Sequence, residues 1–268
     1  NYSVRQRLWQ IRAKTVIIAT GATERPLVFS NNDRPGVMLA SAARRYVNQF
    51  AVKPGNRAVI FANNDDGYKT AVNLAEKGID VRAVVDSRTQ VNDFWKTKLE
   101  QIGVELIQGS AVINTHGHFR LTGVDIATLS SDQKSTNSQS IFISADLLAI
   151  SGGWSPNVHL YCHAGGRPRY EASIAAFIPG LRSQSEYPAG ASNGAFSLID
   201  CIPEGANYAN QLATELGFSK TIFSAPKIDE PKVTPIKALW RIPEKGKKFV
   251  DIQDDVTESD IKLAHQEG

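Results

Sequence analysis

The chain has 268 residues, of which 42% are hydrophobic and 21% charged, so its composition is that of an ordinary globular protein, not of a disordered, collagen-like or disulfide-rich one. Thirty basic residues against 27 acidic ones leave a net charge of +3, which is too small to indicate a nucleic-acid-binding surface. No apolar run reaches the roughly 18 residues of a membrane span, and the two cysteines form no C-x-x-C pair. We therefore expect a cytoplasmic protein with plain thiols and with neither membrane nor nucleic-acid partners.

The chain is expected to be a fragment of a longer protein. Its single Met is Met38, and it opens at Asn1 with a polar stretch that runs directly into an apolar strand. Cloning and proteolysis are both open as the origin of such a fragment, and its oligomeric state is open as well.

A buried strand is expected near the start of the chain. Residues 15–20 form a β-branched apolar run that ends at Gly21, a pattern typical of a strand covered on both faces in a mainly parallel sheet. Because its partner strands are expected to be partly missing from a fragment, this strand should expose an open edge or pair with a neighbouring chain. A polar, Pro-bearing loop follows over 31–36, and an Ala-rich helix is expected over 39–50, before Pro54.

The next segment predicts two successive βαβ units, because short apolar runs alternate with helical patterns that stop at a glycine. The expected strands are 57–62, 81–85 and 104–108, and the expected helices are 67–77 and 94–102. Asn92 or Asp93 can cap the second helix. Two such units in succession require a parallel, Rossmann-like sheet.

After residue 108 the pattern changes to that of an antiparallel meander. Residues 111–115 and 119–129 flank a short His-Gly-His turn and alternate as hairpin strands do. The polar tract 130–140 is expected to be a flexible tip. A buried strand is expected again over 141–150.

The last part of the chain contains one long helix and a connector. The Gly-rich segment 190–194 opens a helix that is expected over 195–216. Beyond Phe223 the composition shifts to Pro and Lys, which indicates an extended connector with no core of its own. The acidic end of the chain contains a helix that starts at Thr257.

Together these elements predict an α/β, Rossmann-like three-layer nucleotide-binding fold of the FAD/NAD(P)-binding type, with an antiparallel β-meander insertion and an extended C-terminal connector. We assign 1–56 to an incomplete first dinucleotide-binding domain and 57–150 to a second Rossmann-like domain with a degenerate fingerprint. Residues 151–223 are expected to return to the first domain, and 224–268 to form the connector.

The turn at residues 62–67 is where a dinucleotide fold would carry G-x-G-x-x-G, but it reads Ala-Asn-Asn-Asp-Asp-Gly. Only the third glycine, Gly67, is present, and the Asn64 side chain occupies the space through which a pyrophosphate would approach the backbone. Asp65 and Asp66 can cap the helix that follows, but their charge opposes a phosphate there. We therefore expect that neither NAD nor FAD occupies this second site.

Asp86 ends the next strand, where a ribose-binding acid would lie in a dinucleotide fold, and the alternative is a simple surface Asp. Thr20 and Gly21 are better candidates for cofactor contacts. They follow the first strand at its carboxyl end, where open α/β sheets bind ligands, although a bare turn is the alternative there. Any bound dinucleotide is expected to contact this loop and the loop at 190–194.

Other chemistry-bearing residues have ordinary explanations. Two histidine pairs have spacings that could share a metal ion, but neither has a third ligand nearby: His116 with His118, and His159 with His163. Cys162 and Cys201 have no neighbouring base and are expected to be buried thiols. The sequence therefore predicts neither a catalytic residue nor a metal site.

Five motifs, in this order, resemble the alpha subunits of heterotetrameric sarcosine oxidases. The motifs are Ile-Ala-Thr-Gly-Ala-Thr-Glu-Arg-Pro at 18–26, Asn-Asn-Asp-Arg-Pro-Gly-Val-Met-Leu-Ala-Ser at 31–41, Ala-Asn-Asn-Asp at 62–65, Ser-Gly-Gly-Trp-Ser-Pro at 151–156 and Ala-Gly-Ala-Ser-Asn-Gly-Ala-Phe at 189–196. The closing segment from Phe249 to Ala264 looks like the connector of that family into a folate-binding domain, which is missing here.

The resemblance implies a bacterial enzyme that oxidatively demethylates sarcosine to glycine, with formaldehyde or methylenetetrahydrofolate and hydrogen peroxide as products. It implies NAD in the intact alpha subunit, FAD, FMN and tetrahydrofolate in the whole complex, and beta, gamma and delta subunits as partners. Gly190-Ala191 stands where flavoprotein relatives place Gly-Asp, which is compatible with NAD. The residues carried over as cofactor-binding are Thr20, Gly21, Gly190, Ala191 and Gly194.

Two alternative functions belong to different classes of protein. A non-catalytic assembly module, of a related amine-oxidising or opine- or cyanide-synthase-type flavoenzyme complex, would associate with other subunits without binding a nucleotide. An independent NAD(P)H–flavin reductase would need two working fingerprints and a redox-active cysteine pair, and the sequence shows neither. In each case the isolated fragment is expected to have no oxidase activity.

Overall fold

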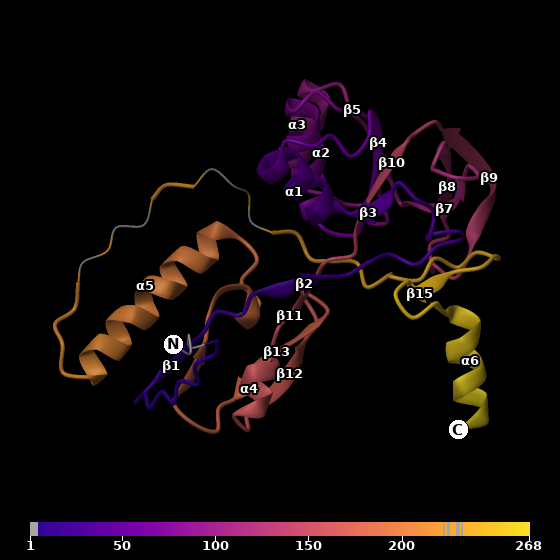
Figure 1. Ribbon diagram of the computed structural model, residues 1–268. Coiled ribbons are helices and arrows are strands. Elements are labelled where there is room, and N and C mark those ends of the chain that lie inside the picture. The colour runs from indigo at the N-terminus through magenta and orange to yellow at the C-terminus, as the bar shows by residue number, and fades with distance from the viewer. Residues whose placement is uncertain (1–4, 222, 224–225, 229–230, 232) are drawn as a thin grey trace. The chain divides into compact units, whose positions relative to one another are not determined.

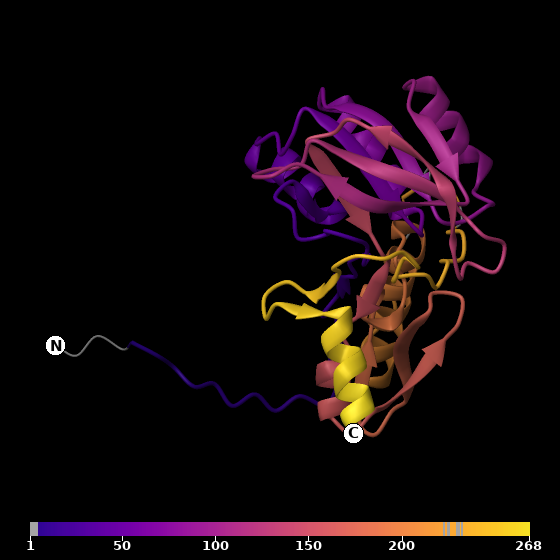
Figure 2. The same ribbon diagram turned by 90° about the vertical axis from the view of Figure 1, so that its right-hand side faces the viewer.

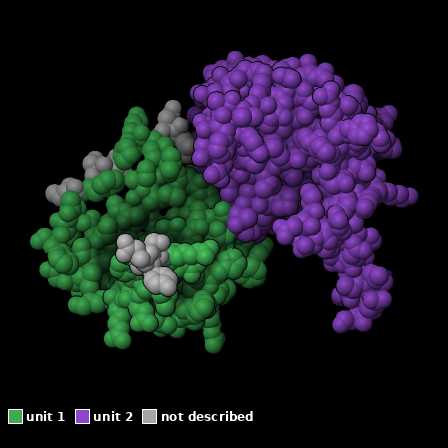
Figure 3. All heavy atoms as spheres, viewed as in Figure 1, with its two compact units in different colours: residues 1–22, 156–171, 176–230 green, residues 23–155, 172–175, 231–268 purple. Residues whose placement is uncertain are grey.

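The computed structural model describes residues 5–221, 223, 226–228, 231 and 233–268. The chain divides into two compact units, each built from separate stretches of sequence (Figure 3). Unit 1 comprises residues 1–22, 156–171 and 176–230, and unit 2 comprises residues 23–155, 172–175 and 231–268. The division falls within two short paired strands, β2 (Ala22–Glu24) and β11 (Trp154–Pro156).

Unit 2 is built around a five-stranded sheet in the order β3-β10-β4-β5-β6, in which every neighbouring pair is parallel. The strands are β3 (Val37–Leu39), β10 (Leu147–Ser151), β4 (Arg57–Ala62), β5 (Asp80–Asp86) and β6 (Glu105–Gln108). In β4 every residue after the first is buried, as expected for a strand covered on both faces. The parallel Rossmann-like sheet predicted from the βαβ pattern is confirmed.

Three helices cover one face of this sheet (Figure 1). They are α1 (Ala40–Phe50), α2 (Asp66–Glu76) and α3 (Asp93–Gln101). Their inward-facing side chains form a core with the sheet, centred on Tyr68, Leu74 and Trp95. The side chain of Asn92 accepts the backbone N–H of Phe94 at 2.9 Å and so caps α3, as predicted.

An antiparallel meander covers the other face, with β8 between its neighbours (Figures 1 and 2). Its strands are β7 (Ser110–His116), β8 (Gly123–Leu129) and β9 (Thr136–Ile143). A second core fills the space between meander and sheet and includes Phe29, Phe61, Leu121, Ile126 and Leu148. Helices, parallel sheet and meander form the three layers of the predicted fold.

Two expectations for this region are wrong. The polar tract 130–140 is not all tip, because residues 136–140 belong to β9 and pair with β8. The expected strand 141–150 is two strands of different sheets, since β9 ends at Ile143 and β10 begins at Leu147. The chain turns between them at Asp146, whose carboxylate accepts the backbone N–H groups of Asn56 and Arg57 at 2.8 and 2.7 Å.

The C-terminal segment of unit 2 is extended over most of 233–248 and then forms a hairpin and a helix (Figure 2). These elements are β15 (Phe249–Asp251), β16 (Val256–Thr257) and α6 (Glu258–Glu267). Thr257 starts the helix, as predicted, and forms a capping box with Asp260. Parts of the predicted connector, at 224–225, 229–230 and 232, lie outside the described residues.

Unit 1 contains a parallel pair of strands, β1 (Val16–Ile18) with β14 (Glu186–Pro188), and an antiparallel hairpin. The hairpin strands are β12 (Arg167–Glu171) and β13 (Ala176–Leu181), and the helices are α4 (His159–His163), the 3₁₀-helix η1 (Gly190–Asn193) and α5 (Leu198–Glu215). Residues 15–20 do not form a strand buried on both faces, but the open edge expected of a fragment is present at β1. Val16 and Ile17 are about half exposed, because β14 is the only strand that pairs with β1 in the described part of the chain.

Candidate functional site

Two loops meet in unit 1 at the carboxyl ends of β1 and β14. The two strands are parallel and Ile18 is in register with Pro188, so the chain leaves both at the same edge. The carbonyl oxygen of Ile18 accepts the backbone N–H of Ala189 at 2.9 Å and the hydroxyl of Ser192 at 2.8 Å. These bonds fix the second loop against the end of the first strand.

The first loop contains Thr20 and Gly21. The Thr20 hydroxyl donates to the carbonyl of Asn157 at 2.7 Å, and the Asn157 side chain donates to the carbonyl of Thr20 at 3.1 Å. Gly21 has φ of +73°, which favours glycine, and a side chain added there would meet no atom within 4 Å. The loop is therefore held in place while its surface stays open.

The second loop contains Gly190, Ala191 and Gly194. Gly190 and Gly194 have φ of +66° and +88°, and between them the chain makes the 3₁₀ turn η1. Glu204, in the second turn of α5, accepts the backbone N–H of Gly190 and the side-chain amide of Asn193, each at 2.5 Å. The sequence analysis did not identify Glu204, since nothing in its local pattern marks a carboxylate that reaches back to a loop.

The structure thus brings Thr20, Gly21, Gly190, Ala191 and Gly194 to one edge of a parallel strand pair. This is the position at which α/β sheets bind ligands, and the glycines allow a ligand to approach the backbone. None of the five side chains can act as a general acid or base at neutral pH. The arrangement is suited to binding a molecule, not to transforming it.

The two cysteines differ in environment. Cys162 is exposed, so the expectation that it is buried is wrong. Cys201 is partly buried in α5, and its thiol donates to the carbonyl of Ala195 at 3.1 Å. Burial, together with the carboxylates of Glu204 and Asp200, raises the pKa of Cys201, which favours the unreactive thiol.

The turn at 62–67 in unit 2 is held by contacts of its own side chains with the rest of that unit. A Cβ on Gly67 would lie 2.4 Å from that of Ala62, so this glycine retains its helix–strand packing role. Asn64 is buried, and its side-chain amide donates to the carbonyl of Ser151 at 2.9 Å. The helix cap expected of Asp65 is absent, because its carboxylate instead pairs with Arg88 at 2.8 Å.

Asp86 is fully buried, so its interpretation as a surface residue is wrong. It accepts the hydroxyl of Tyr68 at 2.6 Å and pairs with Arg88 at 2.8 Å. Burial raises the pKa of Asp86, and the Arg88 guanidinium opposes that shift. Burial also acts to lower the pKa of Arg88, but the carboxylates of Asp86 and Asp65 outweigh it and raise that pKa. The sequence analysis missed Arg88, two residues beyond Asp86.

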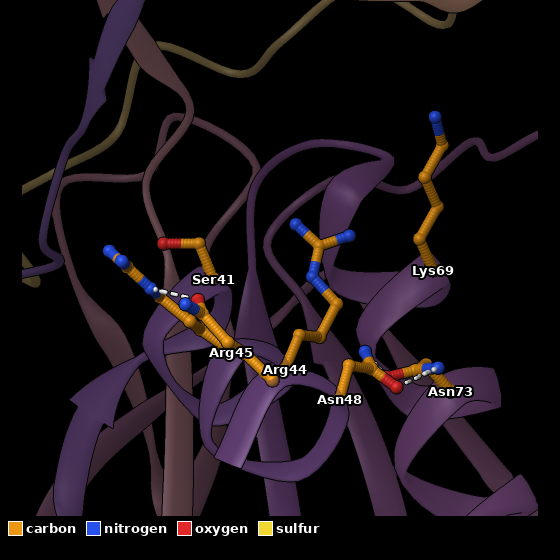
Figure 4. Close-up of a pocket in the computed structure, with 7 residues that line it drawn as sticks. Ser41, Arg44, Arg45, Asn48, Lys69 and Asn73 are labelled. Carbon is orange, nitrogen blue, oxygen red and sulfur yellow. Dashed lines mark hydrogen bonds between the residues drawn. The ribbon is translucent and has the colours of Figure 1, made fainter.

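Helices α1 and α2 enclose an open polar groove of about 520 Å³ (Figure 4). Its lining residues include Arg44, Arg45 and Lys69. Arg44 pairs with Asp66 at 2.6 Å, and Arg45 donates to Gln49 at 2.7 Å. Because neighbouring side chains already engage both guanidinium groups, this groove is a weaker candidate for a ligand site than the loops of unit 1.

The histidines do not gather into a metal site within the part of the chain that the structure describes, where no group of three or more His, Cys, Asp or Glu side chains could hold an ion. His116 contacts Asp125, with 2.6 Å between Nε2 and Oδ2. His159 and His163 are exposed at the two ends of α4. Among the described helices, none has the length and apolarity needed to cross a membrane.

The chain is similar over nearly its whole length to several curated proteins that share one name. It is 39% identical over 266 residues to the sarcosine oxidase subunit alpha of Rhizobium meliloti (strain 1021), and 36% identical over 274 residues to that of Corynebacterium sp. (strain P-1). Each match covers 98% of the chain. The chain is homologous to sarcosine oxidase alpha subunits.

The chain spans about a quarter of the length of these alpha subunits, 26% and 28% respectively. No protein-family model matches it. Among solved structures, the thioredoxin reductase of T. acidophilum has a TM-score of 0.60 at 18% identity, covering 76% of this chain and 66% of that one. L-proline dehydrogenase from P. horikoshii has a TM-score of 0.53 at 20% identity, covering 81% and 40%. These likenesses show that the chain shares the fold of these two proteins.

Proposed function

We propose that the chain is the nucleotide-binding part of the alpha subunit of a sarcosine oxidase. The whole enzyme would convert sarcosine, oxygen and water to glycine, formaldehyde and hydrogen peroxide, or pass the one-carbon unit to tetrahydrofolate as methylenetetrahydrofolate. The proposal rests on similarity to alpha subunits over 98% of the chain. The observation that carries the binding role is the meeting of two glycine-containing loops at the carboxyl ends of β1 and β14.

The proposed ligand of these loops is NAD, held by Thr20, Gly21, Gly190, Ala191 and Gly194. The open space beside Gly21 and the positive φ of Gly190 fit a cofactor that lies against the backbone. NAD would be the nicotinamide cofactor of the intact subunit, and this chain would bind and orient it. FAD, FMN and tetrahydrofolate would belong to the rest of a complex with beta, gamma and delta subunits.

Glu204 makes part of this site more suitable for a ribose than for a phosphate. Its carboxylate lies against the backbone N–H of Gly190, where it would repel a second anion but could accept a hydrogen bond from a hydroxyl. A dinucleotide would therefore place a sugar near Gly190 and its pyrophosphate nearer to Gly21. The two free cysteines fit a reducing compartment, and the proposal places the enzyme in the bacterial cytoplasm.

A second candidate function is a non-catalytic assembly module of a related amine-oxidising or opine- or cyanide-synthase-type complex. Exposed apolar side chains favour it, since Val16 and Ile17 on β1 and Leu198 on α5 are each about half exposed. Such surfaces are typical of contacts with other parts of an assembly. This candidate shares the association with other subunits but not the binding of NAD.

Titrating NAD into the intact alpha subunit, with thermal unfolding as the readout, separates the two candidates. Nucleotide binding predicts a concentration-dependent rise in the unfolding temperature, because a ligand that binds only the folded state stabilises it. The assembly module predicts no shift. The isolated chain, mixed with FAD and sarcosine, should show no turnover, and measurable turnover would contradict the proposed division of labour between subunits.

A further inference from the structure

Residues 234–242 of unit 2, here called the strap, cross the carboxyl ends of β4 and β10. Asn63, directly after β4, makes three hydrogen bonds to the strap. Its carbonyl accepts the N–H of Lys237 at 3.1 Å, and its side-chain amide donates to the carbonyl of Lys237 at 2.9 Å and to the carbonyl of Leu239 at 3.5 Å. Asp65 accepts the backbone N–H of Thr234 at 2.7 Å. The strap thus binds to the turn that would hold a pyrophosphate in a dinucleotide fold.

A buried cluster of charged side chains lies next to these contacts. Arg88 pairs with both Asp65 and Asp86 at 2.8 Å, and its side chain and theirs are 4%, 6% and 0% exposed. Asp65 therefore serves two partners, with Oδ1 on the Arg88 guanidinium and Oδ2 on the strap. This shared carboxylate links the position of the strap to the end of β5.

Three further residues of the strap, at positions 236, 240 and 242, also contact the rest of unit 2. The indole N–H of Trp240 donates to the carbonyl of Gly152, just after β10, at 2.7 Å, and the Arg25 guanidinium lies 4.5 Å from the centre of the indole ring. The N–H of Ile242 donates to the carbonyl of Val28 at 2.8 Å, and Ile242 is fully buried. The Ile236 side chain fills the space beside Gly153, where an added Cβ would come within 2.3 Å of it.

We propose that the strap is an intramolecular ligand that fills the crevice of unit 2 in place of a dinucleotide, and that Asn63, Asp65 and Trp240 are its principal anchors. The residues that depart from the nucleotide fingerprint hold the strap in this arrangement. Asn63 and Asp65 bind peptide groups, and Asp86 holds the arginine that orients Asp65. Unit 2 thereby fixes the path of the connector that leads to the β15–β16 hairpin.

The charges of the site fit a peptide better than a nucleotide. The carboxyl groups of Asp65 and Asp86 already engage the Arg88 guanidinium, so a pyrophosphate would have to approach the Asp65 carboxylate with no free cation of this cluster to bind it. A backbone N–H, by contrast, carries a partial positive charge and is a good partner for a carboxylate. The inference concerns unit 2 alone and does not depend on nucleotide binding by unit 1.

Hydrogen exchange of the full chain, followed by mass spectrometry, tests the proposal. In the native protein, peptides covering the strap should exchange far more slowly than the exposed turn at 131–135, because their N–H groups are bonded to the body of unit 2. The double variant N63A/D65A should speed exchange of the strap by about tenfold or more, as the loss of its polar anchors implies. Peptides of β4 should keep their protection.

The matched control is D66A, which removes a neighbouring carboxylate whose ion pair, among the described residues, is with Arg44 on α1 and not with the strap. It should leave exchange of the strap unchanged. If N63A/D65A unfolds unit 2, the variant W240F replaces it, because it removes the indole N–H and part of the ring but keeps an aromatic side chain. Its effect should be confined to peptides near residue 240. Rapid exchange of the strap in the native protein, or unchanged exchange in N63A/D65A and W240F, would overturn the proposal.

Added NAD separates this inference from the proposed function. Protection of the loops at 19–22 and 189–194, with unchanged exchange of the strap, is the result expected if both are right. If NAD protects neither loop and leaves the strap unchanged, the proposed function fails and the inference stands. Faster exchange of the strap in the presence of NAD would mean that the nucleotide competes for the crevice, which contradicts the inference.

Discussion

Glu24 is a buried carboxyl group in unit 2 that accepts the backbone N–H of Ser41, in the first turn of α1, at 2.9 Å. Burial raises its pKa above the ordinary value of 4.5, and the charge of Asp66 acts in the same direction, while the bond from Ser41 opposes the shift. The folded state therefore holds this proton more tightly than the unfolded state. Its contribution to stability is fully present below pH 4.5 and is lost as the pH rises through the raised pKa.

The variant E24Q should remove this pH dependence, because glutamine stays neutral and its carbonyl can still accept the Ser41 N–H. Relative to the native chain, E24Q should gain stability as the pH rises above 4.5. Urea unfolding of both proteins across this pH range measures the difference. A difference in unfolding free energy that stays constant with pH would contradict a raised pKa for Glu24.

Arg88 pairs with both Asp65 and Asp86 in a buried cluster, so its replacement should be costly. R88M leaves two buried carboxylates without a counter-charge and should destabilise unit 2 by about 3–5 kcal/mol. The control R82M removes an exposed ion pair with Asp80 and should cost at most about 1 kcal/mol. Denaturant unfolding compares them, and equal losses would show that the cluster does not stabilise the fold.

At the residue scale, the sequence showed that the turn at 62–67 departs from the nucleotide fingerprint, but it did not predict the contacts that this turn makes. Asn64 is buried and bonded to Ser151, and the expectation that it blocks the approach of a pyrophosphate stays a prediction. The contacts of Asp65 with Arg88 and with the strap could not be predicted, because Arg88 lies 23 positions and Thr234 lies 169 positions further along the chain. No local pattern specifies such pairings.

At the scale of elements, two helix glycines should respond in opposite ways to the same substitution. G67A places a Cβ 2.4 Å from that of Ala62 and should destabilise the protein by about 1–3 kcal/mol through overpacking of α2 on β4. G205A, in the interior of α5, meets no atom within 4 Å and should stabilise the helix by about 0.5–1 kcal/mol. Thermal unfolding of the two variants checks the signs, and stabilisation by G67A would refute close helix–strand packing.

The pair β1–β14 should be weakly protected in the isolated chain, since a two-stranded sheet is marginally stable on its own. We predict that its amides exchange much faster than those of β4, and that they become protected when the chain is part of the full alpha subunit. Hydrogen exchange of both proteins measures this. Equal and strong protection in the isolated chain would contradict the fragment interpretation.

Elements with a strong local pattern were predictable, and those defined by distant partners were not. The βαβ region from β4 to β6 was predicted to within about two residues, because buried strands and amphipathic helices have distinct periodicities. The strand β9 was missed at its polar start, since its backbone pairs with β8 while its side chains face solvent. The break at Asp146 depends on its bonds to Asn56 and Arg57, which a local reading does not reveal.

At the scale of the whole molecule, the chain leaves unit 2 and returns to it twice. The fold class followed from the sequence because three layers of the kind found here are the usual way to bury a parallel sheet. The assignment of 1–56 and 151–223 to one dinucleotide-binding domain stays a prediction, as do the five cofactor-binding residues. Glu204 could not have been foreseen, since its role depends on how α5 packs beneath the Gly190 loop.

The central claim is that a dinucleotide binds the loops of unit 1 and not the degenerate turn of unit 2. The most direct measurement is calorimetric titration of NAD into the full alpha subunit and into its G190V and N64G variants. G190V places a branched side chain at a φ of +66° and should weaken binding by about tenfold or more, whereas N64G should leave the affinity unchanged. Unchanged affinity in G190V, or tighter binding in N64G, would contradict the account.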